Sequence, residues 1–173
     1  MNGTGRSLGR TLAAAFPHTV PVLTGYLVLG MAYGVLMQAK GYGAIWAFLM
    51  SAVAFCGSMQ FVAITLLTGA FDPVGAFLMS LMVNARHLFY GVSMLGKYRG
   101  MGWAKVPLVY TLSDETFSIV SSVEPPEGMR ARDFYLAVSG LDYIYWVGGS
   151  VLGALAGQFI RFDTTGLDFA LTG

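Results

Sequence analysis

Charged residues are scarce in this chain of 173 residues. Only 11% of its residues are Asp, Glu, Lys or Arg, whereas 55% are hydrophobic; a water-soluble domain has about 25% charged residues. A soluble fold of this length would lack the charge to cover its surface. The net charge is only +1 and the basic residues form no block, so nothing indicates nucleic acid as a partner.

Cysteine is almost absent too. Cys56 is the only cysteine, which excludes an intrachain disulfide and a metal site built from cysteines. We expect no metal and no cofactor, and we expect Cys56 to pack as a small buried hydrophobic residue.

What the chain has instead is a series of long apolar segments. A helix needs about 20 apolar residues to cross the hydrocarbon core of a bilayer, and residues 19–38 meet this requirement without a charge. Arg6 and Arg10 precede that segment as they would in a signal peptide, but its length favours a retained helix. Further segments follow at residues 73–96, 106–123 and 134–160. The predicted fold class is all-α: a polytopic helical integral membrane protein, with one transmembrane domain over residues 1–173.

Residues 41–71 are free of charge over a length that fits neither one helix nor two. If helical throughout, the segment would measure about 46 Å at 1.5 Å per residue. The positive-inside rule favours a segment that enters and leaves on the same side. Six cationic residues then share one side (Arg6, Arg10, Lys97, Arg99, Lys105 and Arg161) and three the other (Lys40, Arg130 and Arg132). We therefore predict a re-entrant hairpin or a pair of short helices, broken near Gly57-Ser58, around a polar centre.

Two acidic residues lie at the middle of segment 106–123, where each charge costs about 2.5–3.5 kcal/mol. On a helical wheel, Asp114 shares a stripe with Thr111, Ser118 and Ser121, and Glu115 flanks it. The predicted helix thus has a polar inward face. A buried ion pair that only locks the helices together is one interpretation, and a face that takes up protons is the other, since carboxylates removed from water change protonation state readily.

The segment 73–96 contains Asn84, Arg86 and His87. On an unbroken helix Asn84 and His87 share one face, while Arg86 lies nearly opposite. Either protein surrounds this helix or the helix unwinds near Asn84. His87 is either a satisfied core group or a proton relay. Arg86 either extends to the membrane surface or needs a carboxylate partner, and three are available: Asp114, Glu115 and Asp142.

The last apolar segment combines an acidic residue with a glycine ladder. Asp142 shares a helical stripe with Trp146 and with the ladder Gly149-x-x-x-Gly153-x-x-x-Gly157. Small residues at this spacing let a second helix approach closely. Asp142 is therefore expected at a helix contact, with a partner helix from this chain or from another subunit. Gly30-x-x-x-Gly34 is a weaker pattern of the same kind.

Three sequence blocks resemble the AzlC-type large subunit of branched-chain amino acid exporters. They are Ser51-x-x-x-Phe55-x-Gly57-x-x-Gln60-Phe61, Asn84-x-Arg86-His87-x-x-x-Gly91 and Leu112-x-Asp114-Glu115-x-Phe117. The likeness covers about residues 16–172. It implies a multi-pass protein of the prokaryotic cell (inner) membrane, with more membrane-embedded sequence beyond residue 173 in family members.

The resemblance also implies an activity. The family exports leucine, isoleucine and valine, with methionine as a further candidate, uses the proton gradient and works as a hetero-oligomer with a small AzlD-type membrane subunit. We expect substrate contacts from Gly57, Ser58, Gln60, Asn84, Arg86 and His87, because broken helices and polar groups at membrane depth bind zwitterions in transporters. We expect proton coupling from Asp114, Glu115 and Asp142.

Two other functions compete with transport. A non-enzymatic pore or assembly subunit would use the polar centre only as structure and would show flux without saturation. An intramembrane hydrolase would need Ser58 as nucleophile and His87 as its base, but no surrounding motif supports that pair. We therefore expect that the protein is not an enzyme.

Overall fold

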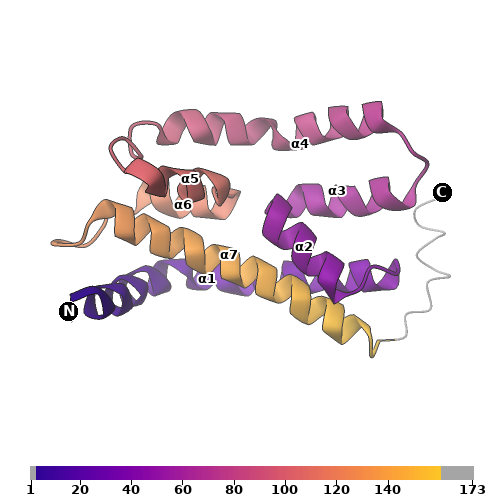
Figure 1. Cartoon of the computed structure of the whole chain (residues 1–173), viewed down its shortest axis with the longest axis horizontal. Coiled ribbons are helices and arrows are strands. Elements are labelled where there is room, and N and C mark those ends of the chain that lie inside the picture. Colours follow the sequence, from indigo (N-terminus) through magenta and orange to yellow (C-terminus); the bar gives the residue numbers. More distant parts are fainter. Residues whose placement is uncertain (1–2, 161–173) are drawn as a thin grey trace.

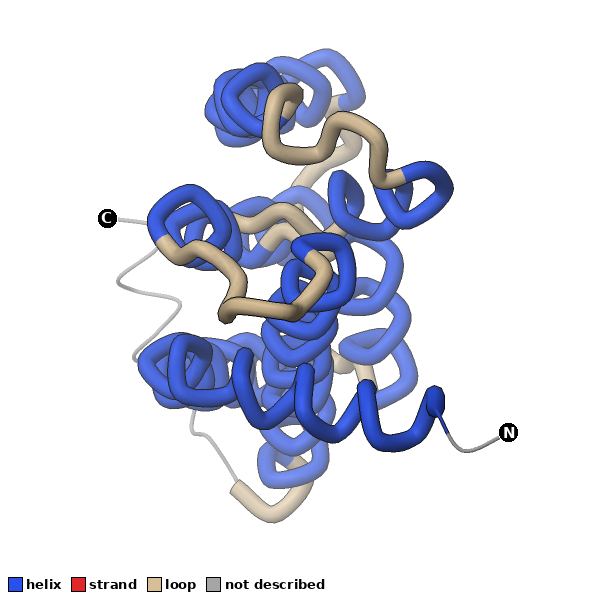
Figure 2. The backbone as a smooth tube through the Cα atoms, turned by 90° about the vertical axis from the view of Figure 1, so that its left-hand side faces the viewer, coloured by secondary structure: helices blue, strands red, loops and turns tan. Residues whose placement is uncertain are grey.

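A computed structural model of the chain describes residues 3–160, and this part is helical without strands (Figure 1). Its helices are α1 (Gly3–Ala39), α2 (Ala44–Ala54), α3 (Gly57–Thr68), α4 (Pro73–Met94), the short 3-10 helix η1 (Gly102–Ala104), α5 (Lys105–Tyr110), α6 (Asp114–Ser122) and α7 (Ala131–Gly157). Figure 2 looks along the molecule from the end where α1 begins, so that most helices are seen nearly end-on. The predicted all-α fold class is confirmed.

Helices α1 and α7 run side by side along the molecule in the same direction (Figure 1). Glycines remove the side chains from their contact: a Cβ on Gly34 would overlap the backbone of Ser150, and a Cβ on Gly153 would overlap the backbone of Met31. Such close approach of two backbones needs small residues on both helices. The partner of the predicted glycine ladder is therefore α1 of the same chain, and the Gly30–Gly34 pattern is part of that contact.

Residues 41–71 contain the predicted pair of short helices, arranged as a hairpin. Helix α2 enters from the end where α1 finishes, the chain breaks at Phe55-Cys56, and α3 returns to the same end (Figure 1). At the break Phe55 adopts the left-handed conformation, with φ 35° and ψ 49°, which ends α2 because L-residues do not continue a helix there. The break lies just before the predicted Gly57-Ser58. We call residues 44–68 hairpin A.

Segment 106–123 is also a hairpin, and the prediction of one crossing helix is wrong. Helix α5 ends at Tyr110, and α6 returns to the end at which α5 began (Figure 1). Ser113 has extended backbone and its side chain accepts a hydrogen bond from Thr116 N, which starts a new helix; serine is favoured as an N-cap and acidic residues in a first turn. Asp114 and Glu115 thus open α6, and the predicted stripe from Thr111 is interrupted. We call residues 105–122 hairpin B.

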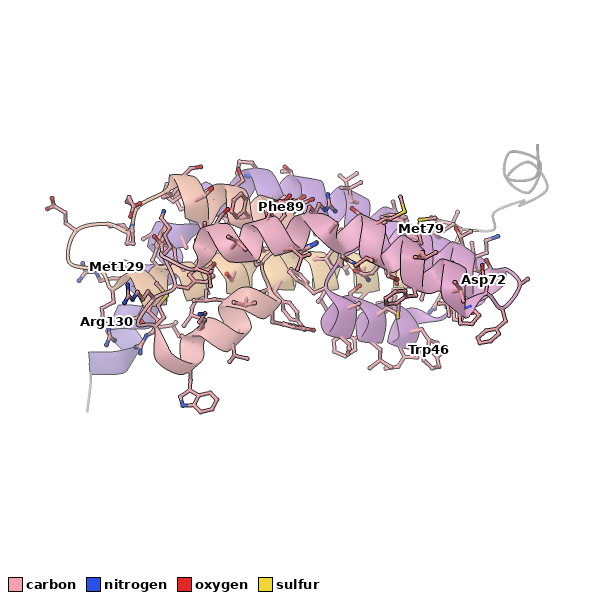
Figure 3. All side chains as sticks on the ribbon, turned by 90° about the horizontal axis from the view of Figure 1, so that it is seen from above. Trp46, Asp72, Met79, Phe89, Met129 and Arg130 are labelled. Atoms are coloured by element: carbon pink, nitrogen blue, oxygen red, sulfur yellow. The ribbon has the colours of Figure 1, made fainter. Side chains whose placement is uncertain are left out.

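Helix α4 is unbroken and lies on the outside of the molecule. Its outward face is apolar and exposed, including Leu78, Met82 and Phe89, the last of which is marked in Figure 3. Within residues 3–160, protein covers only one side of this helix, and the helix does not unwind near Asn84. Both predicted alternatives are therefore wrong for the described part of the chain. The reason is that Asn84, Arg86 and His87 all fit within the arc of the helix that faces hairpins A and B.

The Lys and Arg residues lie mainly at one end of the molecule, because each hairpin returns to the end from which it starts. The end where α1 begins carries Arg10, Lys97, Arg99, Lys105, Arg130 and Arg132, whereas Lys40 lies at the other. Figure 3 shows Arg130 and Asp72 at opposite ends. The prediction that Arg130 and Arg132 lie on the side of Lys40 is wrong, because hairpin B does not cross the molecule. Arg161 lies outside the described residues.

Helix α1 has the composition of a membrane span. Within residues 3–160, only the stretch Leu8–Ala39 of α1 is both long and apolar enough for one, with a mean hydropathy of 1.8. Only 33% of its apolar window is buried inside the molecule, unlike the core helix of a soluble protein. The helices of hairpin A are apolar as well but too short to cross.

Candidate functional site

The tips of the two hairpins meet at a cavity of about 260 Å³ in the middle of the molecule. Helices α1, α4 and α7 complete its walls. Its polar lining comes from Ser58, Arg86, His87, Ser113, Asp114 and Glu115, and its apolar lining includes Leu29, Phe55, Phe61 and Trp146. The volume is close to the lower end of the range for small-molecule sites, about 300–1,000 Å³.

Arg86 connects both hairpin tips. Its Nη1 lies 2.5 Å from Asp114 Oδ2 at the start of α6, and its Nη2 donates a hydrogen bond of 2.7 Å to Ser58 Oγ in the first turn of α3. Of the two predicted alternatives for Arg86, the structure shows a carboxylate partner, and this partner is Asp114. The guanidinium is held between the hairpins and does not extend to the end of the molecule.

Several polar atoms of the cavity lining are buried without a hydrogen-bond partner. They are Arg86 Nε, His87 Nδ1 and Asp114 Oδ1. His87 packs edge-on against Tyr90, with ring centroids 5.7 Å apart. Buried polar groups are nearly always satisfied in native proteins. The wall of the cavity thus contains an unpartnered donor on Arg86 and an unpartnered acceptor on Asp114.

The beginning of α3 adds backbone donors to this site. Cys56 is its N-cap residue and supplies no side-chain hydrogen bond to the helix. The first N–H groups of α3 are therefore free of a cap, and they carry the positive end of the helix dipole. Gly57 lets this turn lie directly on Trp146, since a Cβ there would be 2.9 Å from the indole ring.

Gln60 and Asn84 lie behind the cavity wall rather than in its lining. The buried Gln60 donates to Ser51 Oγ at 2.9 Å and accepts from Trp146 Nε1 at 2.6 Å. Asn84 accepts from Cys56 Sγ at 3.0 Å and donates to a backbone carbonyl of its own helix. Both side chains hold hairpin A in place. Cys56 is half-buried and hydrogen-bonded, so its prediction as a buried hydrophobic residue is wrong.

Asp142 is completely buried on α7 and lies outside the cavity lining. Its Oδ2 accepts a hydrogen bond of 2.7 Å from Thr116 Oγ1 on α6. Glu115 accepts one of 2.6 Å from the Tyr26 hydroxyl on α1. Tyr26, Ser113 and Thr116 were not predicted as site residues from the sequence. The signal for them was a hydroxyl side chain inside an apolar segment, and for Ser113 also the helix-start pattern of a serine before two acidic residues.

Comparison with known proteins identifies relatives over most of the chain. The AzlC protein family matches residues 21–160. The branched-chain amino acid transport protein AzlC of Bacillus subtilis is 46% identical over 159 residues, which is 92% of this chain and 63% of that protein. An uncharacterized membrane protein of Helicobacter pylori is 40% identical over 91% of this chain and 69% of its own length. The inner membrane protein YgaZ of Escherichia coli is 23% identical over 81% of this chain and 58% of its own.

These relatives are longer than the chain itself. The chain spans less than two thirds of the length of the Bacillus subtilis relative, and no solved structure matches it. The family match nevertheless covers the segments that form hairpins A and B, α4 and α7, and the relatives are named as membrane proteins. The chain is a helical membrane protein that belongs to the AzlC family.

Proposed function

We propose that this protein exports branched-chain amino acids across the inner membrane of a prokaryotic cell. Helices α1, α4 and α7 cross the bilayer, and the two hairpins enter it from opposite faces. At 22 and 27 residues, α4 and α7 are about 33 and 40 Å long, enough to cross. The polar residues that α4 and α7 contribute to the site lower the mean hydropathy of these two helices. The positive-inside rule places the end with Arg10, Lys97 and Arg130 in the cytoplasm.

One observation carries the proposal: the tips of two broken segments meet on either side of Arg86. Non-helical backbone at membrane depth is tolerated where it lines a cavity, and transporters place their substrate sites at such breaks near the middle of the bilayer. The similarity to the Bacillus subtilis transport protein supports amino acids as the substrate class.

The cavity offers complementary groups for each part of a branched-chain amino acid. The α-carboxylate binds Arg86 Nε and the backbone N–H groups at Gly57 and Ser58, which have positive potential. The ammonium group binds Asp114 Oδ1, with His87 beside it. The aliphatic side chain packs against Leu29, Phe55, Phe61 and Trp146. In this arrangement Gln60 and Asn84 position the site from behind.

Proton coupling belongs to the acidic residues of hairpin B and to Asp142. Asp114 has a cationic partner in Arg86. Glu115 and Asp142 have hydroxyl partners instead, so a proton can be taken up by either without breaking an ion pair. A small AzlD-type subunit completes the transporter, and co-expression with and without it tests that part.

Transport of labelled leucine into vesicles that contain the reconstituted full-length protein tests the proposal. We expect saturable exchange that unlabelled isoleucine and valine inhibit and D-leucine does not, and net transport that follows an imposed pH gradient. Asp114→Asn should strongly reduce both. Flux that does not saturate, or that ignores stereochemistry, would contradict the proposal and favour a pore.

A further inference from the structure

A continuous row of oxygen atoms links Glu115 at the cavity to the buried Asp142. The Tyr26 hydroxyl donates to Glu115 Oε2 at 2.6 Å, and its oxygen lies 2.7 Å from Ser113 Oγ. Ser113 Oγ lies 3.0 Å from Thr116 Oγ1, which donates to Asp142 Oδ2 at 2.7 Å. All four distances are hydrogen-bonding distances.

A count of protons shows what this row requires. Each hydroxyl supplies one proton, and an ionised carboxylate supplies none. Tyr26, Ser113 and Thr116 therefore provide three protons for four contacts. All four contacts are hydrogen bonds only if one carboxyl group, on Glu115 or on Asp142, carries an additional proton. The row is satisfied equally well with that proton at either end, because every hydroxyl can reverse its direction.

Asp142 is buried and, within residues 3–160, has no cationic partner, as expected of a carboxyl group that receives a proton through this row. Its side chain is 0% exposed and its Oδ1 has no hydrogen-bond partner. No cation among the described residues forms an ion pair with it; the nearby acidic group is Glu115, and Arg86 is paired with Asp114. An unpaired charge in such a place costs several kcal/mol. Since no water-facing surface touches Asp142, Thr116 is the direct route to it.

We propose that Tyr26, Ser113 and Thr116 form a proton relay between Glu115 and Asp142, and that Asp142 stores the transported proton. In the inward step, protonated Glu115 donates to Tyr26, Tyr26 to Ser113, Ser113 to Thr116, and Thr116 to Asp142. One O–H bond breaks and one forms at each hydroxyl, and the net change is one proton moved. This proposal rests on proton coupling in the proposed function.

The position of hairpin B determines whether the row of hydrogen bonds is intact, and therefore whether protons can pass along it. Tyr26 and Asp142 belong to the glycine-packed pair α1 and α7, whereas Ser113, Glu115 and Thr116 belong to hairpin B. Ser113 Oγ accepts from Thr116 N as the N-cap of α6, which fixes the two hydroxyls relative to each other. A displacement of hairpin B would break the row at both of its ends. Proton transfer and the hairpin's position are thereby linked.

The first test compares Thr116→Val with Thr116→Ser in reconstituted full-length protein. Valine keeps the shape and removes the hydroxyl; serine keeps the hydroxyl. We expect Thr116→Val and Tyr26→Phe to lower the ratio of pH-gradient-driven transport to leucine exchange by about 10-fold or more, and Thr116→Ser to restore it. Ser121→Ala, on the exposed side of α6, is the matched control. An unchanged ratio in both Thr116→Val and Tyr26→Phe overturns the relay.

Two further variants separate the relay from the function on which it rests. If Glu115→Gln and Asp142→Asn lower the ratio but Thr116→Val and Tyr26→Phe do not, coupling stands and the relay falls. If Glu115→Gln and Asp142→Asn also leave it unchanged, proton coupling itself is wrong.

Infrared spectroscopy of the detergent-solubilised protein tests the relay without transport. We expect a protonated carboxyl band that Asp142→Asn or Glu115→Gln removes. Its exchange in D2O should be about 10-fold slower in Thr116→Val than in wild type or Thr116→Ser. Equal exchange rates, or the absence of any such band, would overturn the proposal even if leucine is not the substrate.

Discussion

Hairpins A and B both contain a break between two short helices, but different kinds of residue surround the two breaks. Hairpin A contains no charged residue, and the carbonyls released where α2 ends accept hydrogen bonds from tyrosines: Tyr110 contacts Ala52 O and Val53 O, and Tyr143 contacts Ala52 O. Hairpin B instead begins its second helix with Asp114 and Glu115. Apart from the contact of Ser58 with Arg86, the partners of hairpin A are neutral. Hairpin B instead presents two carboxyl groups, one of which is paired with Arg86.

The difference indicates a division of labour at the cavity. Hairpin A supplies shape, backbone donors and an apolar wall, and its polar side chains are already satisfied. In the proposed mechanism, hairpin B supplies the carboxyl groups that take up protons. Substitutions in hairpin A should therefore act on stability and affinity, and substitutions of the acidic residues of hairpin B should act on transport. Four predictions test this comparison.

The largest effect concerns the sidedness of the hairpins. Single cysteines at Lys40 and Phe71, which flank hairpin A, should both react with an impermeant reagent from one side of the membrane. Cysteines at Arg99 and Glu127, which flank hairpin B, should react only from the other. Cys56 is replaced by serine in all four variants. Opposite-side labelling within either pair would show that the segment crosses.

The second effect compares the two groups that contact Arg86. Asp114→Asn removes the ion pair and leaves a guanidinium without its countercharge, which should reduce leucine exchange by about 100-fold. Ser58→Ala removes one hydrogen bond from the other hairpin and should cost about 3-fold. Initial rates in reconstituted vesicles measure both. Equal losses would show that the hairpins contribute alike.

The third effect concerns stability in hairpin A. Gln60→Leu leaves Trp146 Nε1 and Ser51 without their partner in a buried place, at a cost of about 1–3 kcal/mol. A lower thermal midpoint of the solubilised protein measures it. The exposed Gln158 provides the control, since Gln158→Leu should leave the midpoint unchanged. If Gln60→Leu is as stable as wild type but has lost affinity for leucine, Gln60 contacts the substrate directly.

The smallest effect concerns the contact between the hairpins. Tyr110→Phe removes the hydroxyl that hairpin B donates to the end of α2, and should lower the thermal midpoint by the equivalent of about 1 kcal/mol. The pH dependence of transport should stay as in wild type. A shifted pH dependence would show that hairpin A takes part in coupling.

The sequence predicted hairpin A but not hairpin B, for a physical reason. Residues 41–71 are too long for one upright transmembrane helix. Residues 106–123 have the length of one transmembrane helix, so their length gave no sign of the break at Ser113. Length alone cannot distinguish one span from two half-spans when an N-cap serine falls at its centre. The pairing of Arg86 with a carboxylate was predictable, because an unpaired charge at membrane depth has a high free-energy cost. The hydroxyl row was not, because Tyr26, Thr116 and Asp142 meet only through the tertiary fold.

The glycine contact between α1 and α7 has a consequence for biogenesis. These helices are the most distant in the described chain, yet they pack backbone against backbone. During synthesis α1 must wait in the lipid until about 120 further residues have left the ribosome. Its own apolarity over Leu8–Ala39 makes that delay tolerable. Hairpins A and B are synthesised before α7, so substitutions at Gly34 or Gly153, which would keep α1 and α7 apart, should appear as failed maturation and degradation in the cell.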